Sequence, residues 1–274
     1  MKLSACMIVK NEEAMLRMTL PDLVKSVDEV ILVDTGSTDG TVEYAKSCGA
    51  RVYYFSWVND FSAARNESLK HATGDWIIWI DADEYLKPDD FAKLKDGLAE
   101  TKADSFMLQI CECPMSTFKV NSYYLKRKVF KNGAGFHFER PINEQLYEAN
   151  GQAPSEWQLI SKVPIYHWGN FKNEADMEAK KIRNIALLER MVEQNPEDGI
   201  FHYLLAENYR EIKRLKEAVA EYRQVLELKP GQGLAIDALT NLAWSYYKLK
   251  ELKLAHKTAQ KALELDQNNS SAPI

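Results

Sequence analysis

Residues 76–84 constrain the fold more than any other stretch of this sequence. They begin with five bulky or β-branched apolar residues without polar alternation, a pattern typical of a strand buried on both faces of an α/β sheet. Asp81 and Asp83 follow this strand. Ligands of open α/β sheets bind at the carboxyl ends of the strands, so we expect both carboxylates at the binding edge. Carboxylates suit Mg²⁺ or Mn²⁺, and such an ion can hold a diphosphate that carboxylates alone would repel.

The composition excludes several classes of protein. With 274 residues, 46% of them hydrophobic, the chain can form one large or two modest domains. A formal net charge of -5 gives no basic footprint for nucleic acid. No apolar run approaches the roughly 20 residues needed to span a bilayer. Four cysteines do not resemble a disulfide framework, so we predict a cytoplasmic protein.

The first 90 residues alternate between strand and helix patterns, which predicts a doubly wound, mostly parallel sheet. Asp34 ends the second strand as Asp81 follows a later one, so two strands deliver carboxylates to one edge. Asp39 lies in the loop after Asp34. Its carboxylate has two possible roles, capping of the next helix and contact with a ligand. The sequence has neither a dinucleotide fingerprint nor a P-loop, so a bound phosphate requires a metal and an arginine. Arg65 lies near the start of a helix, where a cation gains nothing from the dipole; this indicates a partner such as Asp81 or a phosphate.

Four motifs in this order carry a resemblance to a known family. They are MIVKNEE at 7–13, VDTGSTDGT at 33–41, ARN at 64–66 and IDADE at 80–84. Together they resemble the family 2 glycosyltransferases of the GT-A fold, over roughly the first 90 residues. The resemblance implies a nucleoside contact for Glu12 and Asp34, a place near the ribose and diphosphate for Arg65, a ribose contact for Asp81 and metal binding for Asp83.

One position departs from the family pattern. Many members carry a second aspartate after the one that matches Asp34, and here that residue is Thr35. UDP is still the favoured nucleotide, with the identity of the base less firmly indicated.

Two later segments supply candidates for the base and for a second metal ligand. An inverting transfer needs a carboxylate to take the proton of the acceptor, and Glu144 is the candidate, with Glu139 as the alternative. The repeat-bearing relatives usually show Ile-His-Glu where this chain has Asn143 before Glu144. The Tyr-His-Trp-Gly context of His167 is similar to that of the histidine that completes the metal shell in such enzymes. Packing is the other explanation of His167, and His137 is the alternative ligand.

From residue 174 onward the pattern is helical, with a repeat at a separation of 37 residues. Ala206 matches Ala243 and Tyr209 matches Tyr246 at this separation. The spacing resembles the tetratricopeptide repeat, whose period is 34, with the three extra residues absorbed at 231–233. We expect such an array to dock on one of three partners: the catalytic domain, a polypeptide acceptor, or a second copy of the chain in a homodimer. We expect the last seven residues, 268–274, to form a disordered tail.

These patterns predict an α/β domain at residues 1–172, which by the resemblance has the GT-A fold, and an all-α, tetratricopeptide-like domain at 173–274. The predicted function is a Mg²⁺- or Mn²⁺-dependent, inverting transfer from a nucleotide sugar, favoured to be UDP-linked, to a peptide, protein or glycan acceptor. The domain order resembles that of bacterial peptide S-glycosyltransferases and of surface-polysaccharide enzymes. Two alternatives stay open: a non-catalytic scaffold, and a nucleotidyltransferase, which the acidic loop at 10–13 disfavours.

Overall fold

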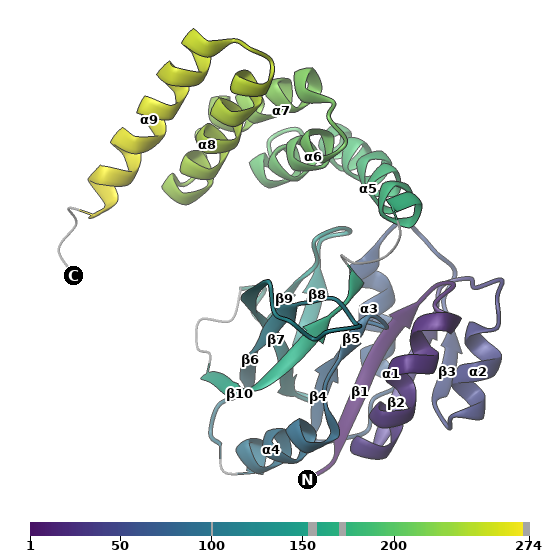
Figure 1. Ribbon diagram of the computed structural model, residues 1–274. Coiled ribbons are helices and arrows are strands. Elements are labelled where there is room, and N and C mark those ends of the chain that lie inside the picture. The colour runs from purple at the N-terminus through teal and green to yellow at the C-terminus, as the bar shows by residue number, and fades with distance from the viewer. Residues whose placement is uncertain (100, 153–157, 170–173, 271–274) are drawn as a thin grey trace. The chain divides into compact units, whose positions relative to one another are not determined.

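The structure is a computed structural model that describes residues 1–99, 101–152, 158–169 and 174–270 (Figure 1). The chain separates into two compact units, Met1–Lys172 and Asn173–Ile274. The point of division falls among residues outside these described ranges, so each unit is considered by itself.

The first unit contains an eight-stranded mixed sheet in the order β3-β2-β1-β4-β7-β6-β10-β5. Strands β3, β2, β1 and β4 are parallel, β7 runs antiparallel to both of its neighbours, and β10 pairs in parallel with β6 and antiparallel with β5. The strands of this sheet are β1 (Leu3–Val9), β2 (Glu29–Asp34), β3 (Arg51–Tyr54), β4 (Trp76–Trp79), β5 (Glu84–Tyr85), β6 (Ser105–Glu112), β7 (Ser122–Lys131) and β10 (Gln158–His167).

A small antiparallel pair, β8 (His137–Glu139) and β9 (Gln145–Tyr147), accompanies the large sheet. The sequence pattern predicted neither this pair nor the two-residue strand β5. All three strands are too short to show a period of two, so only pairing with distant partners defines them.

Strand β4 is buried on both faces, as its apolar run predicted. Ile78 belongs to a core with residues of α1 (Glu13–Ser26), α2 (Thr41–Ser47) and α4 (Pro88–Ala99). Ile77 and Trp79 belong to a second core, which contains β8, β9 and Leu69 at the end of α3 (Phe61–Lys70). Because side chains alternate along a strand, one short strand joins two layers.

The second unit is entirely helical in the part that the structure describes (Figure 1). Ala206, Ala218 and Tyr222 are fully buried, so small residues let the paired helices approach while an aromatic ring fills the space between them. Helix α9 continues to Ser270; the expected tail is therefore wrong for residues 268–270, and 271–274 lie outside the described residues. The helices are α5 (Glu174–Gln194), α6 (Gly199–Glu211), α7 (Leu215–Glu227), α8 (Gln232–Lys248) and α9 (Leu252–Ser270).

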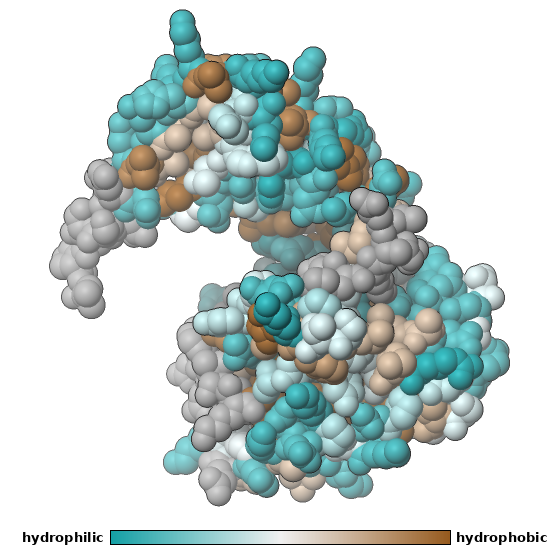
Figure 2. Space-filling model, viewed as in Figure 1, coloured by the Kyte–Doolittle hydropathy of each residue, from teal (hydrophilic) through white to brown (hydrophobic). Residues whose placement is uncertain are grey.

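Apolar side chains reach the surface of the helical unit. Leu252, Leu254 and Leu263 of α9 are exposed, and Figure 2 shows apolar residues interspersed with hydrophilic ones on the viewed face of this unit. No described contact covers the three leucines. The homodimer inferred from the sequence therefore stays a prediction.

Candidate functional site

Asp34 closes the loop that follows β2. Its carboxylate is 3% exposed and accepts hydrogen bonds from the backbone N–H groups of Gly36 at 3.1 Å and Ser37 at 3.1 Å. These bonds fold the loop back onto the end of its strand, in the manner of an Asx turn. Asp34 therefore shapes the carboxyl edge of the sheet.

The loop after β1 is tied to the loop after β2. Asn11 has a φ of 54°, in the left-handed region that asparagine tolerates, and its side chain accepts a hydrogen bond from the N–H of Thr38 at 2.8 Å. The N–H of Glu12 donates to the hydroxyl of Thr41 at 2.8 Å, and the side chain of Glu12 is half-buried. Glu12 and Asp34 thus lie on two loops that are joined at one edge of the sheet.

Arg65 links two carboxylates from distant parts of the chain. Its Nη2 donates to Asp81 at 2.8 Å and its Nε donates to Glu144 at 2.6 Å, while its own side chain is only 7% exposed. Burial alone would raise the pKa of Asp81, but the positive charges of Arg65, Lys128 and Lys126 hold that pKa well below its ordinary value. Burial likewise opposes the charged form of Arg65, and the two carboxylates nevertheless raise its pKa. Both carboxylates are therefore held beside a permanent cation.

The start of α3 places Arg65 in this position. Asp60 caps the helix by accepting a hydrogen bond from the N–H of Ala63 at 2.9 Å. One turn further on, the guanidinium of Arg65 lies 4.3 Å from the centre of a Trp79 ring. A guanidinium stacks well on an aromatic face, so Trp79 supports the cation from the β4 side.

Asn66, the next residue of α3, anchors the strand that leads towards Glu144. Its side chain donates to the carbonyl of Phe138 at 2.8 Å and accepts from the N–H of the same residue at 2.7 Å. The N–H of Phe61 also donates to the carbonyl of Pro141 at 2.9 Å. The ARN motif therefore supplies both the cation and the tether that brings Glu144 to it, which explains why these residues occur together.

Asp83 and His167 meet through the pairing of β5 with β10. His167 is paired with Glu84, and the N–H of Trp168 donates to the carbonyl of Asp83 at 2.9 Å. His167 Nε2 then lies 3.6 Å from Asp83 Oδ1. Burial lowers the pKa of His167, but Asp83, and after it Glu112, raise that pKa to about 9. Two groups separated by 84 positions in the chain thus share one strand edge.

The Asp83–His167 pair fits a divalent cation. Two ligands that each lie about 2.1 Å from one ion can span the 3.6 Å between Nε2 and Oδ1. His167 Nδ1 lies 2.8 Å from Glu112 Oε1, and a carboxylate on the second ring nitrogen is the usual support of a metal-binding histidine. Across the described ranges no group of three or more histidine, cysteine or acidic side chains could hold a metal. Magnesium is commonly held by one or two carboxylates with substrate phosphates, so a two-residue site is consistent with such an ion.

Gly169 leaves room beside this pair. A Cβ at this position would lie 2.3 Å from Asp83 Oδ2 and 2.7 Å from His167 Nε2. Real Cβ atoms do not approach other atoms so closely, so any larger residue would displace the two side chains. The sequence analysis did not identify Gly169, although the Tyr-His-Trp-Gly context contained it.

A buried ion pair supports the turn between Asp81 and Asp83. Lys128 is fully buried and donates to Glu84 at 2.6 Å, and the same carboxylate accepts from the N–H of Asp81 at 2.9 Å. Burial lowers the pKa of Lys128, whereas Glu84 and Asp81 favour its charged form. Lys128 and Glu84 were not predicted as site residues, because a basic residue in a strand pattern is usually exposed.

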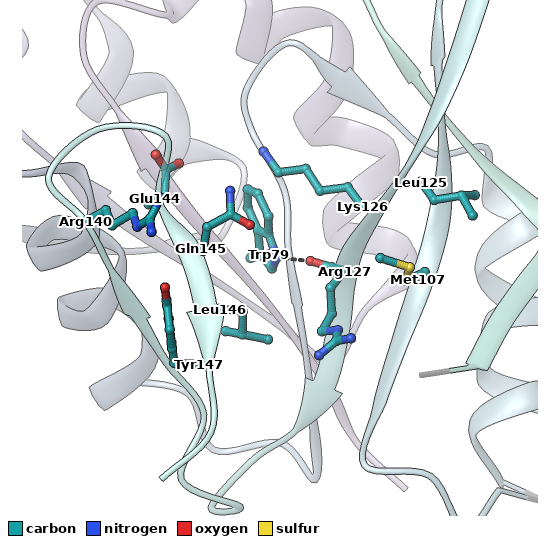
Figure 3. Close-up of a pocket in the computed structure, with 10 residues that line it drawn as sticks. All are labelled: Trp79, Met107, Leu125, Lys126, Arg127, Arg140, Glu144, Gln145, Leu146 and Tyr147. Carbon is teal, nitrogen blue, oxygen red and sulfur yellow. Dashed lines mark hydrogen bonds between the residues drawn. The ribbon is translucent and has the colours of Figure 1, made fainter. Parts of the chain in front are cut away.

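A cavity of about 250 Å³ lies beside Glu144 (Figure 3). The strands β4, β6, β7 and β9 and the loop before β9 contribute its walls. Its lining residues are Trp79, Met107, Leu125, Lys126, Arg127, Arg140, Glu144, Gln145, Leu146 and Tyr147.

The alternative candidates His137 and Glu139 pair with each other. Their side chains lie 3.0 Å apart on β8 and are both substantially exposed. Glu144, in contrast, lies against Arg65 with its side chain 11% exposed. The geometry thus places Glu144, rather than Glu139, in the network with Asp81.

The fold and the site together define an α/β protein with a ligand site at the carboxyl edge of its sheet. A mostly parallel α/β sheet carries loops, carboxylates and an arginine at the carboxyl ends of its strands, where such sheets bind ligands. Residues 4–154 match the model of glycosyl transferase family 2, which spans more than half of the chain. The chain therefore belongs to glycosyl transferase family 2, as its four motifs predicted. Residues 201–232 and 236–269 each match a tetratricopeptide repeat, so that prediction is also confirmed.

Curated sequences are similar to this chain over most of its length. A TPR repeat-containing protein of Synechococcus elongatus is 29% identical over 275 residues, which cover 96% of this chain and 66% of that protein. The glycosyltransferase SunS of Bacillus subtilis is 28% identical over 228 residues, which cover 79% of this chain and 53% of SunS. The chain thus spans between about half and two thirds of the length of these relatives.

Solved structures confirm the fold class. The crystal structure of residues 1–349 of S. aureus TarS aligns with a TM-score of 0.54 at 14% identity, covering 96% of this chain and 92% of that chain. TarS 1–349 in complex with UDP-GlcNAc aligns with a TM-score of 0.51 at 16% identity. The predicted GT-A sheet followed by a helical repeat region is thereby confirmed. Among the described residues, the helices are all too short or too polar to cross a bilayer.

Proposed function

We propose that this chain transfers a sugar from a nucleotide diphosphate donor, UDP-linked, to an acceptor with inversion at the anomeric carbon, in a reaction that requires Mg²⁺ or Mn²⁺. One observation carries the proposal: the Arg65–Asp81–Glu144 network and the Asp83–His167 pair both lie at the carboxyl edge of the sheet. Donor, metal and base functions can therefore be assigned to one edge.

Each predicted site residue has a role in this proposal. Asp83 and His167 hold the cation, which when bound neutralises the diphosphate that leaves. Asp81 binds the ribose, and Arg65 keeps its carboxylate in place. Glu12 and Asp34 contact the nucleoside from the joined loops.

Glu144 takes the proton of the acceptor. The hydrogen bond from Arg65 Nε holds one oxygen of the carboxylate at 2.6 Å, and in this proposal the other oxygen takes the proton. A base that is oriented in this way can remove a hydroxyl proton as the sugar bond forms. If the acceptor is a thiol, which ionises more easily, the demand on Glu144 is smaller.

The relatives support the proposed UDP-linked donor and are compatible with the proposed acceptor classes. TarS has been crystallised with UDP and with UDP-GlcNAc, which favours a uridine nucleotide here. SunS is a glycosyltransferase, and tetratricopeptide repeats commonly present extended binding surfaces, which is compatible with a peptide, protein or glycan acceptor.

A thermal-shift panel tests the proposal. UDP, GDP, CDP and dTDP are compared with and without Mn²⁺, on the wild type, on Asp83→Ala and on Asp75→Ala. Asp75 directly precedes β4 at the opposite end of the strand and is the matched control. At about 100 times its dissociation constant, a ligand stabilises the fold by roughly 2.7 kcal/mol. We expect UDP to do so only with Mn²⁺, in the wild type and Asp75→Ala but not in Asp83→Ala.

A wild type that responds to no nucleotide under either condition would contradict the proposal. The chain would then be a non-catalytic scaffold whose transferase fold carries the repeats. Asn143, which stands before Glu144 with a φ of 54°, is the departure from the family pattern that keeps this second function in view.

A further inference from the structure

The cavity beside Glu144 has a wall of apolar and aromatic groups. Trp79 and Leu146 are buried, and the cavity volume of about 250 Å³ is somewhat smaller than the roughly 300–1,000 Å³ of sites for drug-sized molecules. A single sugar or another compact polyol is therefore an appropriate occupant.

Positive charge exceeds negative charge in this cavity. Lys126, Arg127 and Arg140 line it, and Glu144 is the one acidic residue among the lining residues that the structure describes. Glu144 already accepts a hydrogen bond from Arg65 at 2.6 Å, so its charge is compensated from outside the cavity. This excess stands in contrast to the net charge of -5 for the whole chain.

Two of these cations extend towards the part of the cavity that holds Glu144. In Figure 3, Lys126 and Arg140 reach inward from opposite sides, whereas the guanidinium of Arg127 points to the other end. Within the ranges that the structure covers, neither Lys126 nor Arg140 forms an ion pair. The ammonium of Lys126 lies 4.6 Å from the centre of a Trp79 ring.

The backbone of Arg140 adopts a strained conformation. Its φ of 77° lies in the left-handed region, which a residue with a long side chain rarely adopts. The bond from the Phe61 N–H to the carbonyl of the following residue, Pro141, fixes this turn. Such strain persists where surrounding contacts maintain it, and it is concentrated at active sites and ligand-binding sites.

We propose that this cavity binds the acceptor through a phosphate group, so that the sugar is transferred to a hydroxyl of a phosphorylated acceptor. The inference rests on the proposed function. A phosphate carries nearly two negative charges and three acceptor oxygens, which suits an arginine and a lysine on opposite walls. Glu144 takes the hydroxyl proton and the acceptor oxygen bonds to the anomeric carbon. The bond from that carbon to the diphosphate oxygen breaks, and the nucleoside diphosphate leaves with the electron pair.

Calorimetry with glucose 6-phosphate and glucose as probes tests the proposal. Both are titrated into protein saturated with UDP and Mn²⁺, so that the donor site is filled. We expect glucose 6-phosphate to bind at least about tenfold more tightly than glucose, because hydrogen bonds to charged groups are the strong ones. Arg140→Gln and Lys126→Gln should each remove about tenfold of that affinity. Arg51→Gln, at the amino end of β3, is the matched control and should bind as the wild type does.

Four results would overturn the phosphate assignment. The first is equal affinity for glucose and glucose 6-phosphate, and the second is that glucuronate, which carries a single charge, binds as tightly as glucose 6-phosphate. The third is an equal loss of affinity in Arg51→Gln. The fourth is displacement of UDP by glucose 6-phosphate, because the cations would then serve the donor. A UDP shift that persists in Arg140→Gln shows that this variant is folded.

The failures of the two proposals are distinguishable. If UDP with Mn²⁺ stabilises the wild type while glucose 6-phosphate does not bind, the acceptor inference fails and the proposed function stands. If no nucleotide binds while glucose 6-phosphate binds in an Arg140-dependent way, the phosphate pocket stands without the transferase function.

Discussion

The two ends of the strands in the large sheet each carry a cluster of charged groups, and the clusters differ in what they leave open. At the amino end of β2, Glu29 accepts hydrogen bonds from the hydroxyl of Ser4 at 2.6 Å, from the N–H of Thr73 at 2.6 Å and from Arg51 at 2.7 Å. Both oxygens of the Glu29 carboxylate are engaged. This cluster joins β1, β2 and β3 and has no group left for a ligand.

The cluster at the carboxyl ends is built in another way. Arg65 uses Nη2 and Nε for Asp81 and Glu144, and Glu144 borders a cavity. Asp81 remains 30% exposed beside a cation that is almost completely buried. Similar residue types thus hold strands together at one edge and leave a carboxylate partly exposed at the other. We expect substitutions at the carboxyl edge to affect catalysis and those at the amino edge to affect stability alone.

The largest expected effect is that of Glu144→Gln. An amide cannot take a proton, so transfer to a hydroxyl acceptor should slow by about 10²- to 10⁴-fold, as measured by acceptor-dependent release of UDP. Binding of UDP with Mn²⁺ should persist. Glu139→Gln is the matched control, because Glu139 pairs with His137 outside the network, and it should keep its rate. A larger loss in Glu139→Gln would transfer the role of base to that residue.

Arg65→Met should lower the free energy of unfolding by about 3–5 kcal/mol, because two carboxylates would lose a buried cation. Urea denaturation measures the change. Arg51→Met is the control: Arg51 is half exposed and pairs with Glu29 alone among the described carboxylates, so its loss should cost much less. Equal costs for the two variants would contradict the view that burial and the two carboxylate partners set Arg65 apart from Arg51.

Gly169→Ala should weaken Mn²⁺ binding by about tenfold or more. The added Cβ would collide with both Asp83 and His167, and displaced ligands or ligand supports typically cost this much affinity. Titration of Mn²⁺ followed by electron paramagnetic resonance measures it. Gly231→Ala is the control, since a Cβ there would meet no atom within 4 Å. Unchanged Mn²⁺ affinity in Gly169→Ala would place the metal elsewhere.

The smallest effect is expected for Glu29→Gln, a loss of about 1–2 kcal/mol in stability near neutral pH with the transfer rate unchanged. Burial would raise the pKa of Glu29, but hydrogen bonds from Ser4, Thr73 and Arg51 lower it from 4.5 to about 2.

The charged form of Glu29 is therefore favoured by folding. Its contribution is fully present above pH 4.5 and is lost as the pH falls towards 2, so the wild type and Glu29→Gln should converge in urea denaturation over that interval. A difference that stays constant from pH 7 to pH 2 would contradict this account.

Several features could be predicted from sequence because they depend on local patterns. The apolar run of β4 and the strand and helix alternation define a parallel sheet, and the topology of such a sheet dictates that Asp34 and Asp81 lie at one edge. The separation of 37 residues between matching alanines and tyrosines identified the helical repeats. In each case the period of the side chains reports the local structure directly.

Other features depend on pairing between distant segments. The register of β5 with β10 brings His167 to Asp83, and the β8–β9 pair brings Glu144 to Arg65, which is 79 positions earlier. Lys126 lines a cavity while Lys128, on the same strand, is fully buried against Glu84. No local period distinguishes these two lysines, because the strand bulges and the environment of each is made by other elements.

The sequence by itself thus determined the family, the class of fold and the sheet edge at which the acidic residues lie, because apolar periodicity and motif order are properties of contiguous residues. The tertiary structure alone decided which carboxylate the arginine reaches, which histidine stands beside Asp83 and where Gly169 leaves space. Those contacts join residues far apart in the chain, and their geometry depends on which distant strands pair, as β5 pairs with β10, so the residues around each position do not specify it.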